Sequence, residues 1–462
     1  MTMRRSDLPA DFVLGAATAS YQIEGATQAD GRGASIWDTF ARVPGAIADG
    51  STGDPADDHY RRMPEDVSLI ADLGFDAYRF SIAWPRIQAD GTGPVNPAGI
   101  DFYRRLAEGL LEQGVTPWAT LYHWDLPQAL EDRGGWLERD TAARFAEYAA
   151  LVTEQLGDVV TDWITLNEPW CSSFLGYASG VHAPGRHEGA RSAQAAHHLL
   201  LGHGLALEAV RATRPEARVG TTLNLYSVRP ASDSAEDRDA ARRIDGLSNR
   251  FFLDPVLRGS YPADVLEDLG QTSWFTEHAT AEDLQRIAAP IDFLGINYYS
   301  RHTVAAPADV DEAGTTEPSA YPGSERVRFV RTGAAVTGMD WEVHPDGMVD
   351  VLRQAHDLAP ELPLYITENG SAYPDPDHVG PEGEVVDPDR TAYLRAHLGA
   401  CAAAVDAGLP LRGYFAWSLM DNWEWAWGYS RRFGIVHVDY ETQQRTVKQS
   451  GHWLTAFLRD AD

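Results

Sequence analysis

The chain has 462 residues, of which 44% are hydrophobic and 23% charged, a composition that is ordinary for a globular protein and excludes a disordered one. Its 38 Lys and Arg against 68 Asp and Glu give a formal charge of −30, which disfavours nucleic acid and anionic membranes as partners because both repel such a surface. Two cysteines, Cys171 and Cys401, are too few for a disulfide framework. The sequence contains no run of about 18 apolar residues, so we expect no membrane span.

The N-terminus loosely imitates a signal peptide, since Arg4 and Arg5 are followed by the apolar run 12–19. Asp7, Pro9 and Asp11 interrupt the gap between them, and the apolar run continues into polar residues. We therefore interpret this run as the first strand of a cytoplasmic protein. The sequence leaves the oligomeric state open, a homo-oligomer included.

Strand-like apolar runs alternate with helical stretches along the whole chain. The expected strands are 12–19, 75–82, 115–122, 163–166, 219–225, 293–298, 364–367 and 413–417. The clearest helical patterns between them are 100–113, 141–156, 190–211 and 391–406. Gly74, Gly114, Gly157 and Gly408 follow predicted helices, where a left-handed C-cap is expected.

Eight such units predict an α/β fold, a single (β/α)8 TIM barrel with extended βα loops at its C-terminal face. A doubly wound open sheet is the competing architecture, but residues 15–19 do not form the glycine-rich phosphate turn typical of it. Residues 303–340 and 371–388 are long irregular stretches after strands, which in a barrel rise from the C-terminal face. Because the alternation resumes after each, we expect one catalytic domain over residues 1–462.

Charged residues occur at strand ends, where a buried strand should have none. Glu168 ends the fourth predicted strand, Glu368 ends the seventh, and Arg79 lies within the second. Burying a carboxylate without a partner costs several kcal/mol, so these positions need an explanation. Each glutamate alone could cap the next helix, but both together, with Arg79, favour an acid–base pair at the catalytic mouth of a barrel.

Aromatic residues surround these charges in the sequence. Flat rings together with Gln, Asn, His and Glu side chains suit a sugar, whose rings present apolar C–H faces and a rim of hydroxyls. Any single Trp is better explained as core, whereas the whole set favours a sugar ligand. The set comprises Trp124, Trp170, Tyr299, Trp341, Trp417, Trp425 and Phe433.

Several motifs in order along nearly the whole chain resemble the β-glucosidases of glycoside hydrolase family 1. The two most specific are Thr165-Leu166-Asn167-Glu168-Pro169 and Ile366-Thr367-Glu368-Asn369-Gly370. The others lie at 12–25, 78–86, 122–127, 297–299 and 417–425.

This resemblance implies a retaining β-glucosidase that acts on terminal β-D-glucosyl residues by double displacement. Glu168 matches the acid/base and Glu368 the nucleophile, with Arg79, Asn167 and Tyr299 assisting them. Trp170 and Trp341 match residues on the aglycone side. The expected substrate-binding residues are Gln22, His123, Trp124, Asn167, Asn297, Tyr299, Trp417, Glu424, Trp425 and Phe433. In such an enzyme the two carboxyl groups lie about 5–5.5 Å apart.

Glu424 is the most informative residue for specificity. Its carboxylate can accept two hydrogen bonds from hydroxyl groups but would repel a 6-phosphate. A β-glucoside or cello-oligosaccharide is therefore the expected small-molecule substrate, with β-galactosides and β-fucosides as further candidates. The alternatives are a 6-phospho-β-glycosidase, using Lys448 or residues 430–432 for phosphate, and a catalytically silent sugar-binding barrel.

The mechanism implied by two glutamates needs no metal and no cofactor. His197, His198 and His203 could suggest metal ligands, but 197 and 198 face different sides of an expected helix, which favours roles in the core. Cys171 is expected at the wall of the pocket. Because Asn167 and Glu168 are adjacent and strand residues alternate sides, both can reach one ligand only if the strand is locally irregular.

Overall fold

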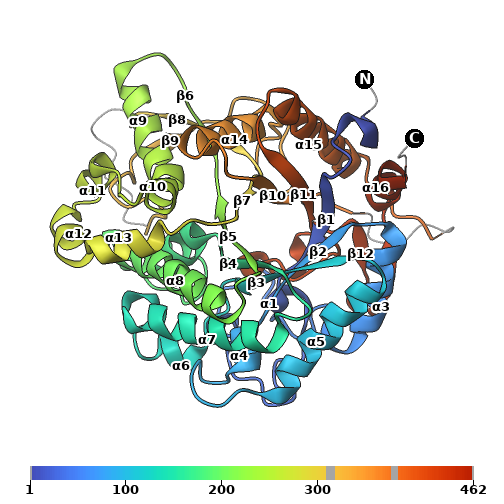
Figure 1. The fold of residues 1–462 in the computed structure, drawn as a ribbon. Helices are drawn as coiled ribbons and strands as arrows, with labels where there is room; N and C mark the ends of the chain where they lie inside the picture. Colours follow the sequence, from blue (N-terminus) through green and yellow to red (C-terminus); the bar gives the residue numbers. More distant parts are fainter. Residues whose placement is uncertain (1–2, 308–317, 376–382, 460–462) are drawn as a thin grey trace.

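The computed structural model describes residues 3–307, 318–375 and 383–459. Within them, parallel strands form a closed barrel in the order β1-β11-β10-β7-β5-β4-β3-β2 (Figure 1). The expected (β/α)8 fold is therefore confirmed and the open sheet is excluded. The strands are β1 (Val13–Ala17), β2 (Ala77–Ser81), β3 (Thr116–Tyr122), β4 (Asp162–Asn167), β5 (Arg218–Asn224), β7 (Phe293–Asn297), β10 (Leu364–Asn369) and β11 (Leu411–Trp417).

Helices cover the outside of the barrel (Figure 1). The long ones are α3 (His59–Leu73), α5 (Pro97–Glu112), α7 (Asp140–Leu156), α8 (Ser192–Thr213), α14 (Asp346–Leu358), α15 (Pro388–Asp406) and α16 (Gln449–Arg459). In α5 the buried residues Ile100, Tyr103, Leu106 and Leu110 recur every three or four positions, so one face packs on the barrel. Shorter helices are α1 (Ser20–Ile23), α2 (Ile36–Phe40), α4 (Trp84–Ile87), α6 (Gln128–Glu131), α9 (Ala235–Asp245), α10 (Phe251–Arg258), α11 (Ala263–Asp268), α12 (Thr272–His278) and α13 (Ala281–Ile287).

One of the glycine predictions is wrong. Gly74, Gly114 and Gly408 have positive φ after their helices, as expected. Gly157 has φ −72° instead, and a Cβ there would lie 2.6 Å from the side chain of Arg214. Glycine at 157 therefore makes room for a packed arginine and does not supply a left-handed turn.

Large aromatic rings fill the interior of the barrel. Trp118 lies 5.0 Å from Phe293, 5.0 Å from Tyr365 and 5.2 Å from Phe415 between ring centroids. Glycine makes room for these rings, because a Cβ on Gly15 would lie 2.4 Å from the Phe415 ring. The barrel is thus closed by side chains below the ends of the strands that carry the charged residues.

The stretch 303–340 is more regular than expected. β8 (Arg301–Ala305) pairs with β6 (Ser227–Pro230) and with β9 (Arg328–Phe329) in a small sheet. Residues 308–317 and 376–382 of the two expected long loops lie outside the described residues.

A hairpin of β12 (Val436–Val438) and β13 (Arg445–Val447) precedes α16. No helix among the described residues is long and apolar enough to cross a bilayer.

Candidate active site

The two glutamates lie at the C-terminal ends of their strands, where both strands are irregular. Glu168 directly follows β4 and has a left-handed φ of 49°. The pairing of β4 with β5 shifts register between Ile164 and Asn167, and β10 shifts against β7 between Ile366 and Glu368. The expected local irregularity is confirmed, and it lets Asn167 and Glu168 both contribute to one network.

Glu368 is held by two donors. Arg79 donates from Nη1 to its Oε1 at 2.6 Å, and the Tyr299 hydroxyl donates to its Oε2 at 2.7 Å. The side chains of Arg79 and Glu368 are only 1% and 4% exposed. A charged donor on one oxygen and a neutral donor on the other stabilise the ionised form of this buried carboxylate.

Asn167 and Asn297 connect the two glutamates. Arg79 donates from Nη2 to Asn167 Oδ1 at 2.6 Å, and Asn297 Nδ2 donates to the same oxygen at 3.0 Å. Asn297 Nδ2 also donates to Glu168 Oε1 at 2.6 Å. Trp124 completes this arrangement by donating from its indole to the Asn167 carbonyl at 2.9 Å. One continuous network therefore fixes both carboxyl groups.

The electrostatics separate the roles of the two carboxyl groups. Burial and the negative charge of Glu368 raise the pKa of Glu168 to about 7. Burial also raises the pKa of Glu368, but the Arg79 guanidinium and the Tyr299 hydroxyl oppose that effect. Because Glu368 has the cation beside it, the proton that the pair shares resides on Glu168.

Both glutamates line one cavity of about 940 Å³, part of it open to solvent. The predicted residues that line it are His123, Trp124, Glu168, Asn297, Tyr299, Trp341, Glu368, Trp417, Glu424, Trp425 and Phe433.

Four predicted residues are absent from the cavity wall. Arg79 and Asn167 lie in the network that contacts the glutamates, and Gln22 contacts Glu424. Trp170 packs beside Tyr226, at 6.2 Å between ring centroids, and its indole nitrogen has no partner among the described residues. These residues support the wall or lie beside it.

Two predicted residues have buried polar atoms without partners: His123, which lines the cavity, and Gln22, which contacts the lining residue Glu424. His123 Nε2 lies 3.0 Å from Asn167 Nδ2, so Nε2 accepts and the ring proton is on Nδ1, which has no partner among the described residues. Gln22 Oε1 is unpaired in the same way, because the amide nitrogen of Gln22 contacts Asn422, Trp423 and Glu424. Unpaired buried donors and acceptors are costly, so a hydroxyl group of a ligand or of water at these two atoms would be stabilised.

Sequence reasoning missed part of the wall. The cavity is also lined by Leu175, His182, Asn224, Leu225, Tyr226, Met339 and Trp427. Asn224 is the last residue of β5, so the strand-end rule applied to Glu168 could have found it. Cys171 lies at the wall as expected, and its thiol donates to Glu168 Oε2 at 3.0 Å.

The three histidines of α8 have the core roles expected for them. His203 Nδ1 contacts the Thr165 hydroxyl at 2.7 Å, and His198 Nδ1 contacts the Trp136 carbonyl at 2.9 Å. His197 Nδ1 contacts the Tyr261 hydroxyl at 2.9 Å. All three rings are buried, and each uses its Nδ1 for a contact within the protein core.

The chain is similar to known proteins along nearly its whole length. A family model described as glycosyl hydrolase family 1 matches residues 4–462. The bifunctional β-D-glucosidase/β-D-fucosidase of Bifidobacterium breve is 47% identical over 460 residues, covering 98% of each chain. β-Glucosidase A of Thermotoga maritima is 44% identical, covering 99% of each. The crystal structure of a psychrophilic β-glucosidase from Micrococcus antarcticus has a TM-score of 0.92 at 49% identity, covering 98% of each chain.

Proposed function

The chain belongs to glycosyl hydrolase family 1, whose members are retaining enzymes, and we propose that it uses Glu168 and Glu368 for its two half-reactions as a retaining β-glucosidase. One observation carries this proposal. Two glutamates line the same cavity, and of the two only Glu368 has its carboxylate paired with the Arg79 guanidinium. We also infer that residues 1–462 form one catalytic domain.

In the first half-reaction Glu368 attacks the anomeric carbon and the bond from that carbon to the leaving oxygen breaks. Glu168 gives its proton to this oxygen, so the aglycone leaves as a neutral alcohol. Arg79 and Tyr299 favour the charged form of the nucleophile, and the raised pKa of Glu168 keeps its proton available near neutral pH. The product on the enzyme is an ester of Glu368.

In the second half-reaction water takes the place of the aglycone. Esterification removes the negative charge of Glu368, which is one cause of the high pKa of Glu168. Glu168 can therefore stay ionised, accept a proton from water and direct the oxygen to the anomeric carbon as the ester bond breaks. Two inversions give overall retention of the β configuration.

Asn167 is proposed to bind the sugar 2-hydroxyl. Its oxygen accepts from Arg79 and Asn297, and one of its two N–H bonds is directed to His123. The second amide N–H is then available to the sugar. A hydrogen bond to the 2-hydroxyl strengthens in the oxocarbenium-like transition state, so an amide held by three partners is suited to this task.

The sugar itself is proposed to bind between the unpaired atoms of Gln22 and His123 and the side chain of Glu424. Burial raises the pKa of Glu424 to about 8, so near neutral pH this carboxyl can donate as well as accept a hydrogen bond. Trp417, Trp425 and Phe433 supply apolar surface on the same side, and Trp341 on the aglycone side. No cation among the described residues lines the cavity, which disfavours a 6-phosphorylated sugar.

Cello-oligosaccharides are the proposed natural substrates, which gives the protein a part in cellulose degradation. β-Fucosides are a second candidate class, since a relative is named for that activity too. Location in the cytoplasm remains a prediction from the sequence.

The stereochemical outcome tests this function. Proton NMR during hydrolysis of an aryl β-glucoside should show β-glucose as the first product, and α-glucose would contradict the retaining mechanism. A silent sugar-binding barrel would release neither anomer. Glu368→Gly should keep the circular dichroism spectrum and lose hydrolysis. Comparing aryl β-glucoside with its 6-phosphate then tests the phospho-glycosidase alternative.

A further inference from the structure

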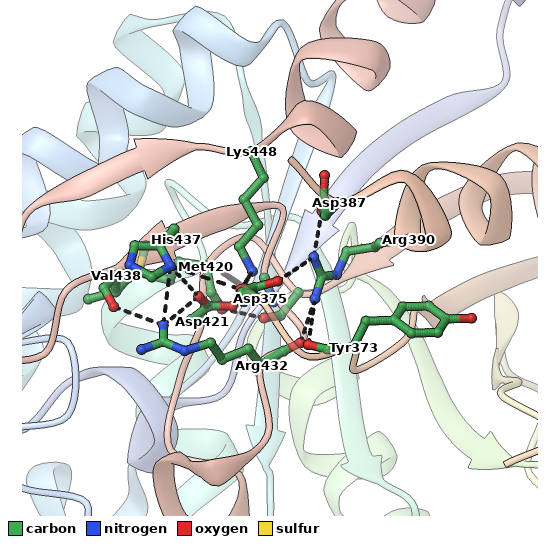
Figure 2. Close-up of polar contacts among 12 residues, drawn as sticks. Tyr373, Asp375, Asp387, Arg390, Met420, Asp421, Arg432, His437, Val438 and Lys448 are labelled. Atoms are coloured by element: carbon green, nitrogen blue, oxygen red, sulfur yellow. Dashed lines mark hydrogen bonds and ion pairs between the residues drawn. The ribbon is translucent and has the colours of Figure 1, made fainter. Parts of the chain in front are cut away.

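A buried cluster of charges lies among three segments that follow the ends of β10 and β11 (Figure 2). Its acids are Asp375, Asp387 and Asp421, and its bases are Arg390, Arg432 and Lys448. We call these six residues the Lys448 cluster. The three negative and three positive charges balance, so the cluster can be buried without a net charge.

Lys448 occupies the centre of this cluster and is the only lysine of the chain. Its ammonium is fully buried and donates to Asp375 Oδ2 at 2.5 Å and to Asp421 Oδ1 at 2.6 Å. Asp375, Asp421 and His437 place ligand atoms within 4.8 Å of one another, as a metal site would. Asp375 is already paired with Lys448 and Arg390, and Asp421 with Lys448 and Arg432, so side chains of the protein supply the positive charge at this site.

One side of the cluster holds the segment that follows β11, residues 418–433, which we call the glycone loop. Asp421 accepts from the backbone N–H of Gly434 at 3.0 Å and from Arg432 Nη1 at 2.7 Å. A Cβ on Gly434 would lie 2.0 Å from the Asp421 nitrogen, so the two ends of the loop are in close contact. Asp421 therefore joins the start of the loop to its end.

The other side of the cluster holds the segment that follows the nucleophile. Arg390 donates to the carbonyl of Ser371, three residues after Glu368, at 3.2 Å and to Asp375 at 3.1 Å. The same guanidinium donates to the Arg432 carbonyl in the glycone loop at 2.8 Å. Arg390 and Lys448 thus each connect the segment 371–375 to the glycone loop.

The glycone loop also reaches the cavity. Asn422, Trp423 and Glu424 directly follow Asp421, and all three accept a hydrogen bond from Gln22 Nε2, at 2.9, 3.0 and 3.1 Å. Phe433 directly follows Arg432 and lines the cavity. A displacement of Asp421 or Arg432 would therefore move the groups proposed to bind the sugar.

We propose that the Lys448 cluster positions the glycone loop against the nucleophile strand, so that Lys448 and Arg390 determine selectivity for the 4- and 6-hydroxyl groups of the sugar without touching it. This inference rests on the proposed function, because it uses the role given to Glu424. The cluster is a positioning device, and its loss should affect substrates with a 6-hydroxyl more than substrates without one.

The test compares aryl β-glucoside with aryl β-xyloside, which lacks the hydroxymethyl group. Lys448→Met should lower the glucoside-to-xyloside ratio of kcat/KM by about tenfold or more, since small misplacements of binding groups are costly. Both rates come from the same preparation, so the ratio does not depend on the folded fraction. An unchanged ratio would overturn the inference.

Arg445→Met is the matched control. Arg445 is a buried cation three residues before Lys448, but it pairs with Asp66 of α3 and not with the glycone loop. This variant should lose stability and keep the substrate ratio. An equal fall in the ratio for both variants would mean that the effect is not specific to the Lys448 cluster and would overturn the inference.

If Lys448→Met does not fold, Arg432→Met removes the other cation that pairs with Asp421, and its side chain is 23% exposed and more tolerant of change. It should lower the ratio in the same direction, and an unchanged ratio would again refute the inference. Wild-type protein treated with a chelator should keep its ratio, and a loss would contradict Lys448 as the resident cation. A wild-type protein that hydrolyses neither glycoside would overturn the proposed function itself.

Discussion

Tyr299→Phe removes one oxygen atom and with it the hydroxyl that donates to Glu368 Oε2 at 2.7 Å. A hydrogen bond to a charged group contributes about 1.5–3 kcal/mol, which corresponds to a rate loss of roughly 10- to 150-fold in attack by Glu368. The same loss destabilises the ionised nucleophile. Its pKa should therefore rise by roughly one to two units, since one unit equals about 1.36 kcal/mol.

The assay is the pH dependence of kcat/KM for an aryl β-glucoside. Activity needs the ionised nucleophile, so the acidic limb of the profile should move to higher pH in Tyr299→Phe while the basic limb stays in place. Tyr298→Phe is the control, because the neighbouring hydroxyl donates to the His344 carbonyl at 2.6 Å and not to a catalytic group. An unmoved acidic limb, or the same shift in both variants, would refute the reasoning.

Three further predictions follow from the same structure. The basic limb of kcat/KM should fall above about pH 7, because Glu168 acts while protonated and loses its proton there, and Glu168→Gln should abolish this limb for substrates with good leaving groups. Glu424→Gln should lower kcat/KM for the glucoside by about 10- to 100-fold, as measured by initial rates. Gly15→Ala forces a Cβ against Phe415 and should cost about 1–3 kcal/mol in thermal unfolding, whereas Gly399→Ala, with open space, should not destabilise.

The barrel was predictable because its signals are local. Each strand is a short apolar run. Charged residues at the ends of two of these runs, Glu168 and Glu368, stand out because buried strands rarely contain them. Eight repeated units favour a closed barrel, and the lack of a glycine-rich phosphate turn at residues 15–19 counts against the open sheet. The role of Gly157 was not predictable, since it depends on packing against Arg214, a residue far away in the sequence.

The residues alone predicted that Glu168, Glu368 and Arg79 lie at one site, whereas the separate roles of the two glutamates came from the resemblance to a known family. Charges at strand ends indicate a shared cavity without any comparison, but they say nothing of which glutamate has Arg79 beside it. His182 and Met339 contribute to the wall from segments outside the strands, and no motif in the sequence marks them. The Lys448 cluster is of the same kind, since Asp375, Asp421 and Lys448 are separated by 46 and 27 positions and meet only in the folded chain.

The central claim is that Glu368 forms a covalent bond to the sugar, and trapping that ester is its most direct test. A 2-deoxy-2-fluoro-β-glucoside with a good leaving group slows both half-reactions but hydrolysis of the ester most. Peptide mass spectrometry of the inactivated enzyme should then find one fluoroglucosyl group on the peptide with Glu368. A label on Glu168 or elsewhere, or complete hydrolysis by an enzyme in which Glu368 is never modified, would contradict the account.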